Sequence, residues 1–459
     1  MTATTLRRAT SVPLPRTWPV RGSDVIAVLV ANGAFILAMW VRHGGLNQLG
    51  TPGGALIAIG QVAALLGTYL MLIQLILMSR TPWLDQAFGM DRLAVAHRWI
   101  GFATVWLIAT HGFFIITGYA FSEHASLPDE AWTIFTTFDF VLLATVGFGI
   151  FVTIGVTSMR AARRRISYES WFLLHLLAYA AIALGFLHQI FVGADFLHDP
   201  LARIYWSSLY VVTAGVILGF RILGPIRLNL RHQFRVARVV EESPGIVSIY
   251  VTGHNLDRLP VRSGQYFVWR FLDGGPRWWS GHPFSISSAP NGEWIRTTVK
   301  ALGDDTRHLQ RLRPGTRAIL EGPYGVLTGL RRSRRRVTMI AGGIGITPLR
   351  ALLEALPARP GDLTLLYRAR HPRHVIFRRE LDTLAERRGA KVHYLVGRRG
   401  SVDLPYDPLD AQGIEELVPD ITTHDVYLCG PDEMMDRVTE TLRELGVPKR
   451  QIHAERFAY

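Results

Sequence analysis

Long apolar runs fill the first half of the chain, and short alternating runs fill the second half. Six runs precede residue 222, and each is close to the ~20 residues that a helix needs to cross a bilayer core. The first run follows 23 largely polar residues without an obvious small-residue cleavage site, which indicates a retained helix rather than a signal peptide. The pattern predicts an N-terminal tail over 1–23 and a six-helix transmembrane bundle over 24–222. The runs lie near residues 24–41, 54–78, 94–118, 138–158, 168–193 and 202–220.

Arginine placement predicts the orientation of these helices, because cytoplasmic loops are enriched in Lys and Arg. The N-terminal tail and the connection at 159–167 are rich in arginine, whereas the 121–137 loop carries acidic residues and neither Lys nor Arg. The tail and the C-terminal half are therefore expected in the cytoplasm. The net charge of +14 is explained largely by this topology, and we find no recognised DNA or RNA motif. The tail carries Arg7, Arg8, Arg16 and Arg21, and the connection carries Arg160, Arg163, Arg164 and Arg165.

Four histidines lie inside two of the predicted spans, where ionisable side chains are costly and usually functional. His97 and His111 are 14 residues apart in the third span, which corresponds to about −40° of net rotation and about 21 Å of rise on an ideal helix. These two therefore share one face near opposite sides of the bilayer. His175 and His188 are 13 residues apart in the fifth span, and about 220° of rotation separates them on a straight helix. We expect a π-bulge or local unwinding around Gly185 to correct this mismatch.

The third and fifth spans run in the same direction, so His97 pairs with His175 on the inner side and His111 with His188 on the outer side. Cys429 is the single cysteine, which excludes a four-cysteine iron–sulfur cluster within this chain. Two imidazoles in apolar surroundings suit haem iron better than zinc, whose structural sites usually take four protein ligands. The pattern predicts two haems. The alternative is that the histidines form hydrogen bonds between helices.

Short alternating strands separated by Gly and Pro turns begin at about residue 231, which is typical of a small antiparallel β-barrel. We place this domain at 231–328. After an arginine-rich linker, apolar runs alternate with helical stretches, which predicts an α/β parallel-sheet domain over 337–459. The expected barrel strands are 234–240, 247–251, 265–271, 294–301 and 317–320, and the expected parallel strands are 337–341, 363–367, 392–396 and 425–429.

A glycine-rich loop lies between the first parallel strand and the next helix. Its glycines are Gly342, Gly343 and Gly345, followed by Thr347 and Pro348. In a strand–loop–helix context, the backbone N–H groups and the helix N-terminus can bind a pyrophosphate. The loop therefore predicts a nucleotide-binding site.

The four histidines, the segment His282-Pro283-Phe284-Ser285, the glycine loop and Cys429-Gly430-Pro431 occur in this order, and with them the chain resembles the ferric reductase/NADPH oxidase superfamily. The match covers nearly everything after residue 23. The resemblance implies a six-helix domain with two b-type haems, joined to a cytoplasmic dehydrogenase of the ferredoxin-reductase type that binds FAD in the barrel.

By the same resemblance, the His282–Ser285 strand binds the flavin, with the Ser285 hydroxyl nearest the reacting ring. The segment that contains Lys300, Gly303 and Thr306 looks like the partner of the FAD diphosphate. Thr347 and Pro348 lie where NAD(P) docks, and Cys429 with Gly430 and Pro431 approaches the nicotinamide. The C-terminal Tyr459 is similar to the aromatic residue that covers the flavin.

NADPH is favoured over NADH because several arginines follow the second and third parallel strands and can pair with a 2′-phosphate. These are Arg368, Arg370, Arg373, Arg398 and Arg399.

The electron acceptor is left open between ferric iron or a general acceptor and oxygen. Superoxide-producing relatives carry a further histidine one turn beyond the outer ligand of the third helix, where this chain has Ile115. Transmembrane reduction of ferric iron is the preferred interpretation, and a superoxide-producing NADPH oxidase is the close alternative. A haem-bearing subunit that donates electrons to a periplasmic redox partner is the alternative of another class.

Overall fold

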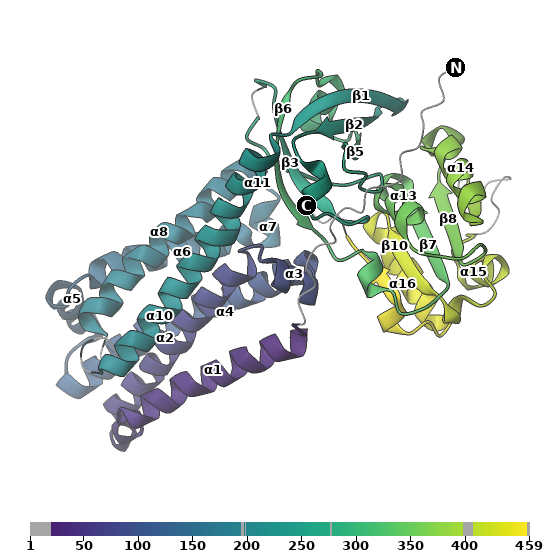
Figure 1. The fold of residues 1–459 in the computed structure, drawn as a ribbon. Helices are drawn as coiled ribbons and strands as arrows, with labels where there is room; N and C mark the ends of the chain where they lie inside the picture. Colours follow the sequence, from purple (N-terminus) through teal and green to yellow (C-terminus); the bar gives the residue numbers. More distant parts are fainter. Residues whose placement is uncertain (1–19, 194–196, 198, 276–277, 398–406, 457–459) are drawn as a thin grey trace. The chain divides into compact units, whose positions relative to one another are not determined.

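The computed structural model describes residues 20–193, 197, 199–275, 278–397 and 407–456. Its residues form two compact units (Figure 1). The helical unit comprises Pro19–Phe88 and Arg92–Ile222, and the sheet unit is built mainly from Leu223–Tyr459.

The helical unit confirms the predicted bundle: six helices among the described residues are long and apolar enough to cross a membrane. Large apolar side chains such as Trp99, Trp106 and Phe113 are exposed on them, as expected of surfaces that face lipid. Short helices connect the long ones. The long helices are α1 (Gly22–Arg42), α2 (Pro52–Leu77), α4 (Met90–Glu123), α6 (Val141–Ser158), α8 (Tyr168–Val192) and the run that begins with α10 (Pro200–Val216), and the short ones are η1 (Gly45–Gly50), α3 (Pro82–Phe88), α5 (Leu127–Thr137) and α7 (Arg160–Arg163).

One long helix extends beyond its predicted limits because its ends are polar, and one short helix lies within a predicted loop. The hydropathy pattern placed the third span at 94–118, whereas α4 has 34 residues and includes the polar turns at both of its ends. The predicted outer loop contains α5, whose start has a clear physical signal. The Ser126 hydroxyl accepts a hydrogen bond from the Asp129 N–H, and Pro128 lies in the first turn, both typical of a helix N-terminus.

The expected irregularity near Gly185 is wrong, because α8 is α-helical from Tyr168 to Val192. A π-helical segment lies instead at Ile217–Leu223, between α10 and α11 (Gly224–His232). The physical reason is Pro225, which has no N–H to donate to the preceding turn and whose ring clashes with the carbonyl four residues earlier.

Six antiparallel strands form the predicted barrel of the sheet unit, in the order β4-β3-β6-β1-β2-β5. A bridge between Ile286 and Thr297 joins the ends of β4 and β5, so the two edges of the sheet meet. Trp269 and Phe267 are fully buried in its apolar core. The strands are β1 (Arg235–Ser243), β2 (Ile246–Thr252), β3 (Tyr266–Leu272), β4 (His282–Ser285), β5 (Ile295–Lys300) and β6 (Arg317–Tyr324), with short helices η3 (Leu256–Arg258), α12 (Asp304–His308), η4 (Leu309–Arg311) and η5 (Gly329–Arg331).

A five-stranded parallel sheet with the order β11-β10-β7-β8-β9 follows the barrel and confirms the predicted α/β domain. The sequence pattern identified four of these strands, and the short β11 was not predicted. The strands are β7 (Val337–Gly342), β8 (Leu363–Ala369), β9 (Lys391–Val396), β10 (Asp425–Cys429) and β11 (Ile452–Ala454), and the helices are η6 (Gly343–Gly345), α13 (Ile346–Ala355), η7 (Pro372–His374), α14 (Arg378–Arg388), α15 (Ala411–Leu417), η8 (Ile421–Thr423), α16 (Asp432–Glu444) and η9 (Lys449–Gln451).

A buried histidine directly before β10 makes the parallel-sheet domain sensitive to acid. His424 is 4% exposed, and its Nδ1 lies 2.8 Å from the Thr338 hydroxyl. Burial, followed by the charge of Arg336, lowers the pKa of His424 from 6.5 to about 4. As the pH falls below 6.5, the unfolded chain binds a proton that the folded domain resists, so the free energy of unfolding decreases until about pH 4.

We expect this decrease to have a slope of at most about 1.4 kcal/mol per pH unit, the limit for one proton. Urea unfolding of the domain, followed by pulse proteolysis at pH 7.5, 6 and 5, measures it. His424→Gln should have a shallower slope, whereas His371→Gln, at an exposed position, should not. Equal slopes for the native protein and His424→Gln would contradict the assignment.

Candidate functional site

The histidines of α4 and α8 face each other in two pairs within the helical unit. The ring centroids of His97 and His175 are 5.9 Å apart, with an interplanar angle of 64°. His188 lies near enough to His111 for the two rings to interact electrostatically. The structure therefore brings the four histidines together in two pairs, although α8 is α-helical from Tyr168 to Val192.

Backbone carbonyls of α2 orient both histidines of α4. The Nδ1 of His97 lies 3.2 Å from the Gln74 carbonyl oxygen, and the Nδ1 of His111 lies 3.0 Å from the Gly60 carbonyl oxygen. Because a carbonyl only accepts, each Nδ1 donates, and the lone pair of each neutral ring is on Nε2. Gly60 and Gln74 are 14 residues apart on α2, the same spacing as the two histidines on α4.

The two histidines of α8 lack such partners. The Nδ1 atoms of His175 and His188 are buried and have no hydrogen-bond partner among the residues that the structure describes. Trp171, one turn before His175, stacks on its ring at a centroid distance of 5.0 Å. The guanidinium carbon of Arg163 lies 5.0 Å from the Trp171 ring centroid.

Helix α6 packs closely along α8 beside these rings. A side-chain carbon added at Gly185 would meet nothing within 4 Å. Between the two histidine layers, α2, α4, α6 and α8 contribute a compact apolar cluster: Met71, Phe151, Ala181, Val105, Ile108, Ile150, Ala178 and Ile182.

This arrangement fits two haems. No group of three or more His, Cys, Asp or Glu side chains that could hold a metal ion occurs in the described part of the chain. A pair of imidazoles is sufficient only where another molecule supplies the remaining ligands, as a porphyrin does. The unpartnered Nδ1 atoms and the open flank at Gly185 are compatible with a flat macrocycle between α4 and α8.

In the barrel, β4 places Ser285 opposite Tyr266 of β3. The Ser285 side chain is 3% exposed, and its Oγ has no hydrogen-bond partner within the described residues. The Ser285 carbonyl accepts a hydrogen bond from the Thr297 hydroxyl at 3.0 Å, which fixes the strand. A buried hydroxyl without a protein partner usually serves a ligand or a water, so this strand fits the predicted contact with a flavin.

The remaining residues of the flavin motif lie on the same strand. The rings of His282 and Phe284 stack at a centroid distance of 5.9 Å, and the Phe284 carbonyl accepts a hydrogen bond from Trp269 Nε1 at 3.0 Å. Pro283 pairs with Val268 on β3. The strand is therefore held to β3 by backbone and side-chain contacts.

The glycine loop and the segment after β10 pack directly on each other. A side-chain carbon added at Gly345 would lie 2.2 Å from the Cys429 carbonyl oxygen, and one added at Gly342 would lie 2.8 Å from the ring of Pro431. Gly430 approaches Gly342 in the same way. Gly343 has φ +53° and faces open space, so its conformation requires glycine and its outer side remains accessible.

Cys429 is fully buried at the carboxyl end of β10. Burial, followed by the negative charge of Glu455, raises the pKa of the Cys429 thiol well above its ordinary value. The thiol is therefore protonated at neutral pH. In this form it is neither a nucleophile nor a base.

Glu455 is a candidate that the sequence pattern did not single out. Its carboxylate reaches the end of the barrel, where a side-chain carbon added at Gly325 would lie 2.7 Å from Glu455 Oε1. Gly325 would also come within 3.1 Å of Tyr266, the residue opposite Ser285. Glu455 thus brings a negative charge from the parallel-sheet domain to the flavin strand.

Several other predicted ligands use their polar groups within the protein. The Thr306 hydroxyl accepts from Gly303 N–H at 3.0 Å and donates to the Gly303 carbonyl, whereas Lys300 at the end of β5 is exposed. The buried Thr347 donates to the Ile344 carbonyl at 3.0 Å, and Pro348 beside it is buried. The guanidinium of Arg368 donates to the carbonyls of Ala369, Leu395 and Gly397.

Three further candidates, Arg398, Arg399 and Tyr459, lie outside the described residues. The arginines of the N-terminal tail before residue 20 do so as well.

Three family models match the chain in succession. Residues 63–186 match the ferric reductase like transmembrane component, residues 233–328 an FAD-binding domain and residues 339–440 the oxidoreductase NAD-binding domain. The chain belongs to the ferric reductase/NADPH oxidase-like superfamily. As a member of this superfamily, it is an NAD(P)H-dependent oxidoreductase with FAD- and NAD(P)-binding domains and a multi-pass transmembrane domain.

Curated relatives match part of this superfamily member. Ferredoxin–NADP reductase B of Sorangium cellulosum is 34% identical over 192 residues, which is 38% of this chain and 77% of that protein. A flavohemoprotein of Pseudomonas aeruginosa is 34% identical over 266 residues, which is 55% of this chain and 63% of that protein. The FAD/NAD-binding domain of a nitric oxide dioxygenase from Vibrio cholerae is 24% identical, with a TM-score of 0.41 over 49% of this chain and 98% of that one.

Removing the Ser285 hydroxyl tests whether that group serves the flavin. We expect Ser285→Ala to slow flavin reduction by NADPH about tenfold or more, because one hydrogen bond to the reacting ring is lost. Stopped-flow absorbance at the flavin band measures the rate per bound FAD.

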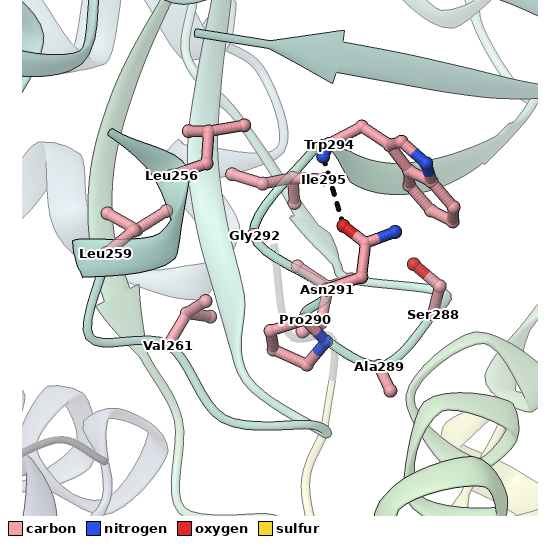
Figure 2. Close-up of a pocket in the computed structure, with 11 residues that line it drawn as sticks. Leu256, Leu259, Val261, Ser288, Ala289, Pro290, Asn291, Gly292, Trp294 and Ile295 are labelled. Atoms are coloured by element: carbon pink, nitrogen blue, oxygen red, sulfur yellow. Dashed lines mark hydrogen bonds between the residues drawn. The ribbon is translucent and has the colours of Figure 1, made fainter. Parts of the chain in front are cut away.

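Ser288→Ala is the matched control, because Ser288 is equally buried and lines a small hollow under the β4–β5 connection (Figure 2). Its rate should be unchanged. A Ser285→Ala rate equal to that of the native protein would remove Ser285 from the site.

Proposed function

We propose that this protein moves electrons from cytoplasmic NADPH through FAD and two bis-histidine b-type haems to an acceptor on the outer face of the cell membrane. Ferric iron or a general acceptor is the proposed substrate at that face. The observation that carries the proposal is the pair of histidine layers, each with one ring oriented through Nδ1 by a carbonyl of α2. The corresponding domains are 24–222 for the haems, 231–328 for FAD and 337–459 for the nucleotide.

The sheet unit would serve hydride transfer by position rather than by acid–base chemistry. The Gly342–Gly345 loop holds the nucleotide phosphates, and Ser285 hydrogen-bonds the flavin. Cys429 offers a neutral surface to the nicotinamide, and the Glu455 carboxylate lies beside it. FAD, when bound, supplies the conversion of a two-electron donor into single electrons, and the haems supply one-electron carriers.

The four histidines would hold the haem irons, and the two of α4 would do so through Nε2 because their Nδ1 atoms are engaged. A carbonyl bond to Nδ1 fixes the ring plane and the tautomer and makes the opposite nitrogen a stronger ligand. His97 and His175 would hold the inner haem, and His111 and His188 the outer one. The apolar cluster around Phe151 would keep water out of the layer between them.

The surroundings of His111 favour metal reduction over superoxide production. Ile115, one turn further along α4, packs against Gly60 of α2, where a side-chain carbon would come within 2.9 Å of it. This position therefore offers an apolar surface rather than a proton donor or a cation. Oxygen and a periplasmic redox protein are the alternative acceptors that the measurements below distinguish.

Single histidine substitutions test the order of the carriers. We expect His97→Ala to lose one haem and to abolish reduction of the other by NADPH, while flavin reduction persists. His111→Ala should also lose one haem, yet the remaining haem should still be reduced, and only the acceptor should stay oxidised. Anaerobic spectra with NADPH, followed by ferric chelate or oxygen, measure each step.

His124→Ala is the control, since His124 is exposed in a connection outside the pairs, and it should keep both haems. Native protein without haem absorption would contradict the ligand assignment. Haem that stays oxidised in the presence of NADPH would contradict the assignment of NADPH as the donor or of FAD as the carrier that reduces the haem. Reoxidation of the haem by oxygen alone would favour a superoxide-producing NADPH oxidase. Reoxidation only by a copurified protein would favour electron donation to a periplasmic redox partner.

A cluster of cations at the carboxyl end of β8 supports NADPH as the donor. Burial, followed by the charges of Lys300, Arg373, His371 and Arg370, lowers the pKa of His374. Arg370 and Arg373 are exposed, whereas Arg368 donates to backbone carbonyls. The two exposed arginines are therefore the proposed partners of the 2′-phosphate.

We expect Arg370→Ala and Arg373→Ala each to raise the KM for NADPH about tenfold, the value of one charge-assisted hydrogen bond, with the KM for NADH unchanged. Steady-state reduction of a dye with each nucleotide measures the two constants. Arg379→Ala, at an exposed position on α14, is the control. An equal rise in the KM for NADPH and for NADH would contradict recognition of the 2′-phosphate by these arginines.

A further inference from the structure

An ion pair between a buried arginine and a partly exposed glutamate joins the barrel to the parallel-sheet domain. Arg296 on β5 is 1% exposed, and its two terminal nitrogens donate to the Glu380 carboxylate on α14 at 2.7 and 3.0 Å. The same guanidinium donates to the Ser287 hydroxyl at 3.1 Å and to the Ser287 carbonyl at 2.6 Å. Phe377, just before α14, covers it, with 4.7 Å between the guanidinium carbon and the ring centroid.

A second arginine extends this contact to α13. Arg350 Nε donates to Glu380 Oε2 at 2.9 Å, and Arg350 also pairs with Glu354 one turn further along. Glu354 in turn accepts a hydrogen bond from the Ala289 N–H of the barrel at 2.7 Å. We call Arg296, Glu380, Arg350 and Glu354 the interdomain clamp, since every member bonds another across or along the boundary.

The clamp is connected through short stretches of chain to both proposed binding segments, Ser285 on β4 and the Gly342–Gly345 loop. β5 holds the flavin strand directly, because Thr297 donates to the Ser285 carbonyl while its neighbour Arg296 donates to Ser287. On the other side, α13 begins directly after the Gly342–Gly345 loop, and Arg350 lies in its second turn. A displacement of the clamp would therefore move the nucleotide loop relative to Ser285.

Burying the charge of Arg296 against Glu380, whose side chain is 37% exposed, is not an efficient way to stabilise a fold. A buried pair recovers its desolvation cost only with good geometry, and apolar residues often stabilise as well or better. What a bidentate arginine adds is direction, because its planar fork fixes the orientation of the carboxylate that it binds. Hydride transfer between groups held on two domains depends on such directional contacts, because a small misplacement of the reacting atoms lowers the rate by a large factor.

We propose that Arg296 and Glu380 are positioning residues that hold the NAD(P)-binding domain against the FAD barrel so that nicotinamide and flavin meet in the geometry of hydride transfer. The inference rests on the donor half of the proposed function and is independent of the haems. Both residues act through Ser287, Arg350 and the two elements that carry the proposed site.

Glu380→Gln removes the charge and keeps the shape of the clamp. We expect flavin reduction by saturating NADPH to slow about tenfold or more in the full-length protein. FAD content and the dissociation constant for NADPH should change by less than about twofold, because the ligand contacts remain. The primary deuterium isotope effect with NADPH deuterated at the transferred position should rise, since hydride transfer becomes the slow step.

Arg296→Lys is the second variant, because it keeps the charge but loses the bidentate geometry. Its rate should fall between those of the native protein and Glu380→Gln. Glu386→Gln changes an exposed carboxylate on the same helix and is the matched control, with an expected rate and isotope effect equal to the native values.

These measurements distinguish a positioning role of the clamp from a general loss of structure and from a wrong assignment of the electron donor. A structural defect would lower the fraction of active protein and leave the rate constant and isotope effect of that fraction unchanged, which would overturn the inference. A native rate in Glu380→Gln would overturn it too. Native protein whose flavin NADPH fails to reduce would instead reject the donor in the proposed function.

Discussion

The helical unit is organised by the cost of polar rings in an apolar bilayer. An imidazole inside hydrocarbon must find partners within the protein, and α2 supplies them for α4 by offering two carbonyls at the same 14-residue interval as the two histidines. One of these carbonyls belongs to Gly60, and the absence of a side chain there lets α4 approach closely enough for the bond at His111. The position of α4 against α2 thus fixes the tautomer and direction of two rings, and the rings of α8 meet them from the other side.

Hydropathy and spacing predicted much of this unit, because both are local properties of the chain. The six spans, the two histidine layers and their pairing follow from runs of apolar residues and from rotation per residue. The prediction of an irregularity near Gly185 was wrong, because it required both histidines of the fifth span to share one face, whereas the two pairs occur on a helix that is α-helical from Tyr168 to Val192. The π-helical segment lies instead at Ile217–Leu223, where Pro225 disturbs the preceding turn.

In the sheet unit, the fold of each domain could be predicted from the sequence, but the contacts between the two domains could not. Strand alternation and the glycine loop predicted the barrel and the parallel sheet. The sequence could not predict the approach of Glu455 to Gly325 or the contact of Arg296 with Glu380, because both join residues that are far apart in the chain and lie on different domains. Arg368 shows the same limit, since its place after β8 suggested a phosphate partner, while the structure directs it to backbone carbonyls.

The two histidine layers are built alike on α4 and differ on α8. Both α4 rings bond a carbonyl, so this contact distinguishes neither layer from the other. The difference lies at His175, where the Trp171 ring stacks at 5.0 Å and carries the guanidinium of Arg163 above it. A nearby positive charge stabilises the electron-rich state of a redox centre, so in the proposed function this surrounding favours the arrival of an electron at the inner layer, next to its source.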